Sequence, residues 1–148
     1  MSHPLRYRMA IAFLTLVAAL VATYLHLWKL GLTGALSCSS AGGCEVAMLS
    51  QWGQFLGLDV ALIGAVGYVV LFGISLWSLR PRWERSAAPT LALLALIIPA
   101  VLFTIRLKYA EWHLLRTFCP WCFESAVTIT LCLVLALLDW RRVRRTTA

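Results

Sequence analysis

The chain has 148 residues, of which 61% are hydrophobic and only 13% are charged. So few charges exclude the hydrated surface that a water-soluble domain of this length needs, and they indicate an integral membrane protein. The formal net charge of +7 is explained by basic residues beside anionic membrane lipid, so we expect lipid contact and no nucleic-acid partner.

Four apolar segments predict an all-α membrane protein, a four-transmembrane-helix bundle that forms one domain over residues 1–148. In chain order they cover about 9–28, 60–79, 88–107 and 119–138. Each is close to the roughly 20 residues that a helix needs to cross about 30 Å of hydrocarbon. The basic flank of the first segment also suits a cleaved signal peptide, with Ala35-Leu36-Ser37-Cys38 faintly like a lipoprotein cleavage site, but three further spans disfavour cleavage.

The loop after the first span carries a cysteine pair and a predicted cap helix. Cys38 and Cys44 enclose Ser-Ser-Ala-Gly-Gly, a flexible connection that would let a disulfide move between partners. From Glu45 to Leu58, apolar residues recur at helical spacing: Val46, Leu49, Trp52 and Phe55 or Leu56. This pattern predicts a short amphipathic helix lying over the mouth of the bundle.

A second cysteine pair, Cys119-Pro120-Trp121-Cys122, stands at the head of the fourth span. Pro120 suits the first turn of a helix because it lacks the N–H that would be unpaired there. A helix start also favours a thiolate on Cys119, so a lowered pKa is expected. Two cysteines at this spacing can open and close as a dithiol and a disulfide.

The distribution of basic residues predicts the orientation. With both termini in the cytoplasm, nine of the thirteen Lys and Arg residues lie inside, and only Lys29, Arg106, Lys108 and Arg116 remain outside. All four paired cysteines then face the outer side, where disulfides persist. We therefore expect a bacterial cytoplasmic (inner) membrane protein with outward-facing cysteine pairs. Alternative readings of the pairs are structural staples, a redox sensor, or a zinc site of four thiolates.

The order of these motifs resembles the vitamin K epoxide reductase family. The matching pieces are Cys38 and Cys44, then Ser50-Gln51-Trp52-Gly53, then Gly57, Gly64 and Tyr68, and finally Cys119-Pro-Trp-Cys122 followed by Ser125. The resemblance implies a four-helix bundle around a quinone, capped by a short helix. Bacterial members are disulfide-forming quinone reductases. The other bacterial family with that activity carries its Cys-x-x-Cys in the first outer loop, so the order here argues against it.

The resemblance also implies a role for each cysteine. Cys38 would form a mixed disulfide with a separate DsbA-like thioredoxin-fold partner, since this chain lacks the thioredoxin-like domain that is fused to many relatives. Cys44 would then attack Cys119, and Cys122 would be released beside the quinone. Re-forming the Cys119–Cys122 disulfide would deliver two electrons to ubiquinone or menaquinone, without a metal.

The expected quinone contacts are Trp52, Phe55, Asp59, Tyr68, Trp121 and Ser125, with Ser50 supporting the loop or the thiolates. The animal enzymes carry an asparagine near the second span and a tyrosine one turn after the second active-site cysteine. The corresponding regions here read Gly57-Leu58-Asp59-Val60-Ala61 and Glu124-Ser125-Ala126. Because neither side chain is present, the resemblance favours plain quinone reduction over epoxide reduction.

Four other residues attract attention in the sequence: Cys132, His26, His113 and Glu124. Cys132 is predicted to be a packing residue. The two histidines are expected to be solvated or to cap helices, with proton relay as the alternative. Glu124 lies within a span, which marks it as a functional candidate, although a carboxylate that reaches to the interface would give the same pattern.

Overall fold

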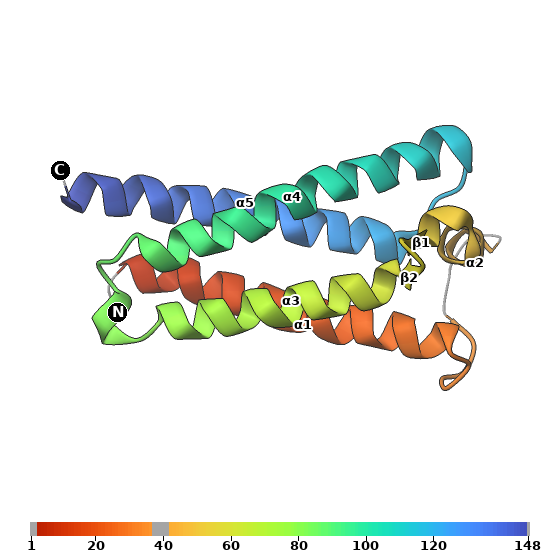
Figure 1. The fold of residues 1–148 in the computed structure, drawn as a ribbon, viewed down its shortest axis with the longest axis horizontal. Helices are drawn as coiled ribbons and strands as arrows, with labels where there is room; N and C mark the ends of the chain where they lie inside the picture. Colours follow the sequence, from red (N-terminus) through yellow and green to blue (C-terminus); the bar gives the residue numbers. More distant parts are fainter. Residues whose placement is uncertain (1–2, 37–41, 148) are drawn as a thin grey trace.

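Four long helices dominate the computed structural model, which describes residues 3–36 and 42–147 (Figure 1). They are α1 (His3–Lys29), α3 (Val60–Ser78), α4 (Ala88–Tyr109) and α5 (Pro120–Thr147), and a π-helical turn, η3 (Ala110–Leu114), continues α4. The stretches long and apolar enough to cross a membrane are Leu5–Lys29, Val60–Ser78, Ala88–Leu114 and Pro120–Thr146. The predicted four-transmembrane-helix bundle is confirmed, and the chain is a multi-pass membrane protein.

Two helices extend beyond the apolar segments that predicted them. The first predicted span begins at residue 9 and the fourth ends at residue 138, whereas α1 begins at His3 and α5 continues to Thr147. Charged residues limit how deep a segment lies in hydrocarbon, but they do not end a helix, because its hydrogen bonds are made by the backbone. The hydropathy pattern therefore gives the membrane-embedded part of each helix and not its full length.

Small side chains let the helices pack closely. α1 makes its most extensive contacts with α3, and α5 packs against both α4 and α1. Ala18 and Ala22 of α1 and Ala65 of α3 are buried in the shared core. Small residues bring helix backbones together in lipid, where no water is expelled by apolar contact. On the outside, Phe13 and Leu102 are 66% and 63% exposed, as expected for side chains that face lipid.

A buried ion pair joins the helices at the end of the bundle where both termini lie (Figure 1). Arg8 Nε donates to Asp139 Oδ2 at 3.0 Å, and both side chains are 1% exposed. Thr90 Oγ1 donates to the same carboxylate oxygen at 2.6 Å. The remaining N–H groups of Arg8 donate to the carbonyls of Ser78, Trp83 and Ser86 and to Thr90 Oγ1. One guanidinium thus joins α1 to α3, α4, α5 and the α3–α4 connection, which contains the 3-10 turn η2 (Pro81–Trp83).

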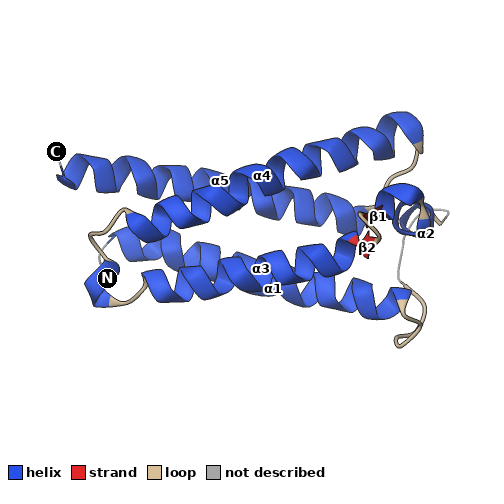
Figure 2. Cartoon of the chain, in the orientation of Figure 1, coloured by secondary structure: helices blue, strands red, loops and turns tan. Residues whose placement is uncertain are grey.

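A small cap covers the opposite end of the bundle. It consists of α2 (Gly43–Leu49), the 3-10 turn η1 (Gln51–Gly53) and two antiparallel strands, β1 (Gln54–Phe55) and β2 (Leu58–Asp59), drawn red in Figure 2. The predicted short cap helix is confirmed. Its predicted extent, Glu45 to Leu58, is wrong, because the second half of this stretch is a turn and a hairpin.

The backbone explains why the cap helix ends early. Gly53 packs so tightly against the Met48 carbonyl that any Cβ at position 53 would collide with it. Leu56 and Gly57 both have positive φ, 53° and 80°, as in the two-residue turns that join short hairpins. The apolar spacing of Trp52 and Phe55 imitated a helix face, although these side chains belong to the turn and the hairpin.

Removal of one partner from the Arg8–Asp139 pair is expected to destabilise the bundle strongly. Arg8→Ala leaves a buried carboxylate without its cation, and such a change costs about 3–5 kcal/mol. Chemical unfolding in detergent micelles measures the loss. Arg145→Ala removes an exposed charge from the same end of the bundle and is the matched control. A destabilisation equal to that of Arg145→Ala would contradict the assigned role of the pair.

Candidate active site

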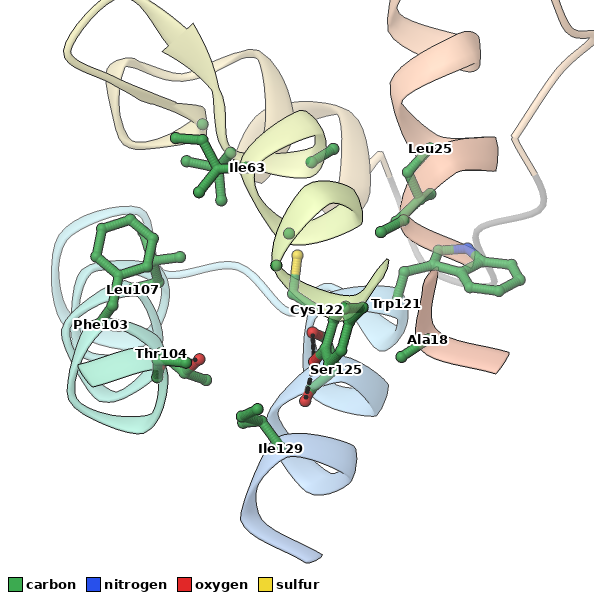
Figure 3. Close-up of a pocket in the computed structure, with 18 of the residues that line it drawn as sticks. Ala18, Leu25, Ile63, Phe103, Thr104, Leu107, Trp121, Cys122, Ser125 and Ile129 are labelled. Atoms are coloured by element: carbon green, nitrogen blue, oxygen red, sulfur yellow. Dashed lines mark hydrogen bonds between the residues drawn. The ribbon is translucent and has the colours of Figure 1, made fainter. Parts of the chain in front are cut away.

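A cavity of about 510 Å³ lies between the four helices and the cap. Figure 3 shows Trp121, Cys122 and Ser125 on the first turns of α5, with Ile63 of α3 and Phe103 of α4 among the facing side chains. All six residues predicted as quinone contacts line this cavity: Trp52, Phe55, Asp59, Tyr68, Trp121 and Ser125. The walls are mostly apolar, with a few polar groups at the cap end and on α5, as is usual for a small-molecule site.

The two cysteines of the Cys119-Pro-Trp-Cys122 motif are free thiols at the start of α5. Cys122 N–H donates to Cys119 Sγ at 3.3 Å, so the first turn of the helix directs a backbone donor at that sulfur. Cys119 is completely buried, and Cys122 is the one described cysteine that lines the cavity. The motif therefore presents its two sulfurs to different surroundings.

The surroundings of Cys119 lower the pKa of its thiol. The hydrogen bond with the Cys122 side chain is the largest cause, and it outweighs burial, which raises the pKa. The Cys122 N–H and the positive charge of Lys108 lower the pKa further, whereas the Glu111 carboxylate raises it. The direction agrees with the thiolate predicted from the helix start, and the thiol of Cys122 adds a cause that the sequence did not indicate.

Glu111 anchors the segment that leads into this motif, and sequence reasoning missed it. Its side chain lies in η3, is 4% exposed in the fold and accepts from the Cys119 N–H through Oε1. Lys108 Nζ binds Oε2 at 2.8 Å, and the Glu111 carbonyl accepts from Thr117 N–H at 3.1 Å. The available signal was an acidic residue three positions after a basic one, just past the end of the third apolar segment.

The first cysteine pair of the chain is described only in part. Cys44 is buried in the first turn of α2 and is disulfide-bonded, whereas Cys38 lies outside the described residues. A Cβ at Gly43 would collide with the Phe118 carbonyl and would lie 2.8 Å from Thr117 Oγ1. The start of α2 is thus packed directly on the segment that precedes Cys119.

Ser50 closes the cap helix at its far end. Its Oγ donates to the Ala47 carbonyl at 2.9 Å, and its extended backbone (ψ 167°) ends α2. This contact stabilises the end of α2, and the role predicted for Ser50 in supporting the loop stays a prediction. Sequence reasoning also allowed contact with the thiolates, and that alternative stays a prediction.

Tyr68 and Ser125 form a polar pair on the wall of the cavity. The Tyr68 hydroxyl lies 2.8 Å from Ser125 Oγ and donates to the Ser125 carbonyl at 3.2 Å. Ser125 follows Cys122 by one helical turn, and dashed lines in Figure 3 mark the hydrogen bonds made at Ser125. The pair places two hydroxyls in the mostly apolar cavity wall, one helical turn from Cys122.

Asp59 joins the cap to α1 and begins α3. Its carboxylate accepts from Lys29 Nζ at 2.6 Å, from the Ala61 N–H at 3.2 Å, and lies 2.7 Å from His26 Nδ1. Burial raises the pKa of Asp59, but the hydrogen bonds from Lys29, His26 and Ala61 together outweigh it and lower the pKa. His26 is therefore hydrogen-bonded to the residue that caps α3, and the solvated or capping role expected for His26 stays a prediction.

Aromatic residues of the cap, α4 and α5 line part of the cavity. The Phe55 and Phe103 rings meet edge to face with centroids 5.1 Å apart, and the Arg106 guanidinium lies 5.4 Å from the centre of the Trp52 ring. Trp121 packs against Tyr24 with centroids 6.4 Å apart. These contacts fix flat apolar surfaces where the planar ring of a ligand would stack.

The other residues singled out from the sequence have distinct environments. Cys132 is completely buried in the core, as predicted for a packing residue. The His113 ring packs against Tyr109 with centroids 4.7 Å apart. Glu124 lines the cavity, and its Oε2 is buried without a hydrogen-bond partner. The carboxylate of Glu124 therefore does not reach out to the interface.

A comparison with protein families agrees with the motif order. The model of the vitamin K epoxide reductase family matches residues 9–137. This range includes the second and third spans, most of the first and fourth, the cap and both cysteine pairs. The match covers most of the chain.

The lowered pKa of Cys119 is testable by titration of its thiolate. Ultraviolet absorbance of the reduced protein, minus that of Cys119→Ser, should show a midpoint below the usual value of about 8.5. Lys108→Met should raise the midpoint because it removes a positive charge, and Glu111→Gln should lower it because it removes a negative one. A midpoint at or above that of an ordinary cysteine would contradict the described environment.

Proposed function

The chain belongs to the vitamin K epoxide reductase family and is a membrane thiol-disulfide oxidoreductase, and on this premise we propose that it oxidises a thioredoxin-fold protein and reduces a membrane quinone. The main support is the placement of the inner cysteine pair. Cys119 is buried next to the segment that α2 packs on, and Cys122, one turn later, lines the cavity between the helices. One helical turn thus separates a protein-facing sulfur from a cavity-facing sulfur.

The proposed reaction begins with the outer pair, in which we infer a disulfide between Cys38 and Cys44. A thiolate of the reduced partner attacks Cys38, which forms a mixed disulfide and releases Cys44 as a thiolate. The second partner thiol then attacks the partner's own sulfur, so the partner leaves oxidised and the outer pair is a dithiol. Cys44 attacks Cys119 and releases Cys122, and attack by Cys38 on Cys44 restores the outer disulfide and leaves Cys119 reduced.

The inner dithiol then passes its electrons inward. Cys119 and Cys122 form a disulfide and lose two electrons, for which a quinone bound in the cavity serves as acceptor. The cavity fits such a ligand, since Trp52, Phe55 and Trp121 supply flat apolar walls and the Tyr68–Ser125 pair supplies hydroxyls. Ubiquinone and menaquinone share the planar ring and apolar tail that this lining would accept.

The polar groups of the cavity favour quinone over epoxide as the substrate. Leu58 and Asp59 form strand β2 where the animal enzymes are expected to carry asparagine, and Asp59 is already engaged by Lys29, His26 and Ala61. No tyrosine follows Cys122 by one turn, where Ser125 stands instead. We therefore propose plain quinone reduction as the activity.

The proposed setting is the cytoplasmic (inner) membrane of a bacterium. Exposed arginines cluster at the end of the bundle that holds both termini, for example Arg141 and Arg145 on the last turns of α5. The positive-inside rule assigns this end to the cytoplasm. The cap and both cysteine pairs then face the oxidising side, where the separate DsbA-like, thioredoxin-fold partner would be found.

Quinol formation should require all four paired cysteines. The experiment uses full-length protein in liposomes with a reduced thioredoxin-fold protein and ubiquinone or menaquinone, and it follows quinone absorbance. Wild type should form quinol, whereas Cys38→Ser, Cys44→Ser, Cys119→Ser and Cys122→Ser should lose turnover, because each removes one sulfur of the relay.

Cys132→Ser is the matched control for these variants, because Cys132 is a buried cysteine of the same helix that lies in the core. Its turnover should stay close to that of wild type. Continued quinol formation by Cys122→Ser would contradict the relay. Absence of turnover with every quinone, together with bound zinc, would favour the staple or metal-site alternatives.

The partner should be trapped on Cys38 when Cys44 is absent. In Cys44→Ser, the Cys38 thiolate attacks the disulfide of an oxidised thioredoxin-fold protein, and the mixed disulfide cannot be displaced by Cys44. Rapid alkylation, a non-reducing gel and mass spectrometry of the linked peptides identify the complex. The double variant Cys38→Ser/Cys44→Ser should give none, and linkage of the partner through Cys119 in place of Cys38 would contradict the proposed order of attack.

A further inference from the structure

Glu124 occupies an unusual position in the cavity wall. It lies on the first turns of α5, two residues after Cys122 and directly before Ser125. Its Oε1 accepts from the Thr128 hydroxyl at 3.1 Å, while Oε2 is buried and has no hydrogen-bond partner. A buried carboxyl oxygen without a partner is costly, so whatever fills the cavity would have to supply the missing hydrogen bond.

The other titratable side chains that line the cavity are already engaged. They are Lys29 of α1, Asp59 of β2, Tyr68 of α3, Lys108 of α4, Glu111 of η3 and Cys122 of α5. Asp59 accepts from three groups, and both oxygens of Glu111 are hydrogen-bonded. Among the described carboxyl oxygens that line the cavity, Oε2 of Glu124 is therefore the one that is available to a ligand.

We propose that Glu124 is a catalytic acid that transfers a proton to the quinone as the Cys119–Cys122 disulfide forms. The inference deepens the proposed function and rests on it, since it assigns a proton donor to the same cavity. The Glu124 carboxyl would contact a ring oxygen of the quinone through Oε2, and Thr128 would hold its other oxygen. Ser125 and Tyr68, next to it on the wall, would orient the ring.

The balance of the reaction calls for such a donor. Quinol formation consumes two electrons and two protons. Both electrons come from the sulfurs when the disulfide bond forms. Cys122, which takes up a proton from solvent after its release, supplies one proton with its thiol. The lowered pKa of Cys119 favours the thiolate form, which brings no proton to the quinone. Glu124 supplies the second proton, becomes a carboxylate, and is reprotonated by water after the quinol leaves.

The Glu124→Gln variant tests the loss of proton transfer without a change in the shape of the side chain. Glutamine keeps the size and the hydrogen bonding of the side chain but cannot act as an acid at neutral pH. General acid catalysis contributes about 10²–10⁴-fold to rate, so we expect kcat for quinone to fall at least about tenfold with little change in KM. Glu124→Asp keeps an acidic group and should retain more turnover than Glu124→Gln.

Two readouts do not depend on turnover. Without quinone, the reduced partner should still reduce the Cys119–Cys122 disulfide in Glu124→Gln at the wild-type rate, because thiol exchange involves no proton transfer to a quinone. Redox-difference infrared spectra with quinone bound should show a carboxyl C=O band in wild type that is absent in Glu124→Gln. Glu84→Gln, on the α3–α4 connection at the other end of the bundle, is the control and should behave as wild type.

Three results would overturn the role of Glu124. They are an unchanged kcat in Glu124→Gln, a rise in KM alone, or equal losses in the Asp and Gln variants. Each would leave the thiol relay intact. By contrast, failure of the relay itself would appear as quinol formation that persists in Cys119→Ser, so the two proposals fail in distinguishable ways.

Discussion

The buried Arg8–Asp139 pair is the interaction on which the rest of the bundle depends. A single guanidinium, 1% exposed, contacts every long helix or the connection beside it, and Thr90 shares the same carboxylate oxygen. Hydrocarbon provides little drive for helices to associate, so polar contacts and small residues must set their arrangement. Because these contacts hold the helices together at one end of the bundle, the helices can leave a cavity at the other end without changing their arrangement.

The end that faces the cap is held by polar contacts that are spread over several side chains. Lys29 and His26 bind Asp59, Lys29 also donates to the Gly53 carbonyl, and Glu111 accepts from the Cys119 N–H. These contacts hold the cap on α1 and position the first turn of α5. One end of the bundle is thus joined by a single buried ion-pair network, and the other end bears the cavity under the cap, as the proposed relay requires.

The sequence predicted the features that depend on composition and short spacing. Lipid-facing helices must be apolar along their length, so the four spans were visible, and Cys119-Pro120 marked the start of α5. Contacts between distant residues were not visible, because Arg8 and Asp139 stand 131 positions apart and each resembles an ordinary flanking charge. The cap helix was extended too far because Trp52 and Phe55 repeat at helical spacing, whereas the backbone of Leu56 and Gly57 forms a turn.

The first turn of α5 separates the sites of the two proposed reactions, disulfide exchange and quinone reduction. Disulfide exchange requires an incoming thiolate in line with a sulfur, which suits Cys119, buried beneath the segment on which Gly43 packs. Quinone reduction requires a sulfur inside an apolar cavity, which suits Cys122. Three residues of helix span only about 4.5 Å, so closure of one disulfide connects both environments. In the proposed relay, closure of this one disulfide carries electrons from the loop before α3 into the bundle without motion of the transmembrane helices.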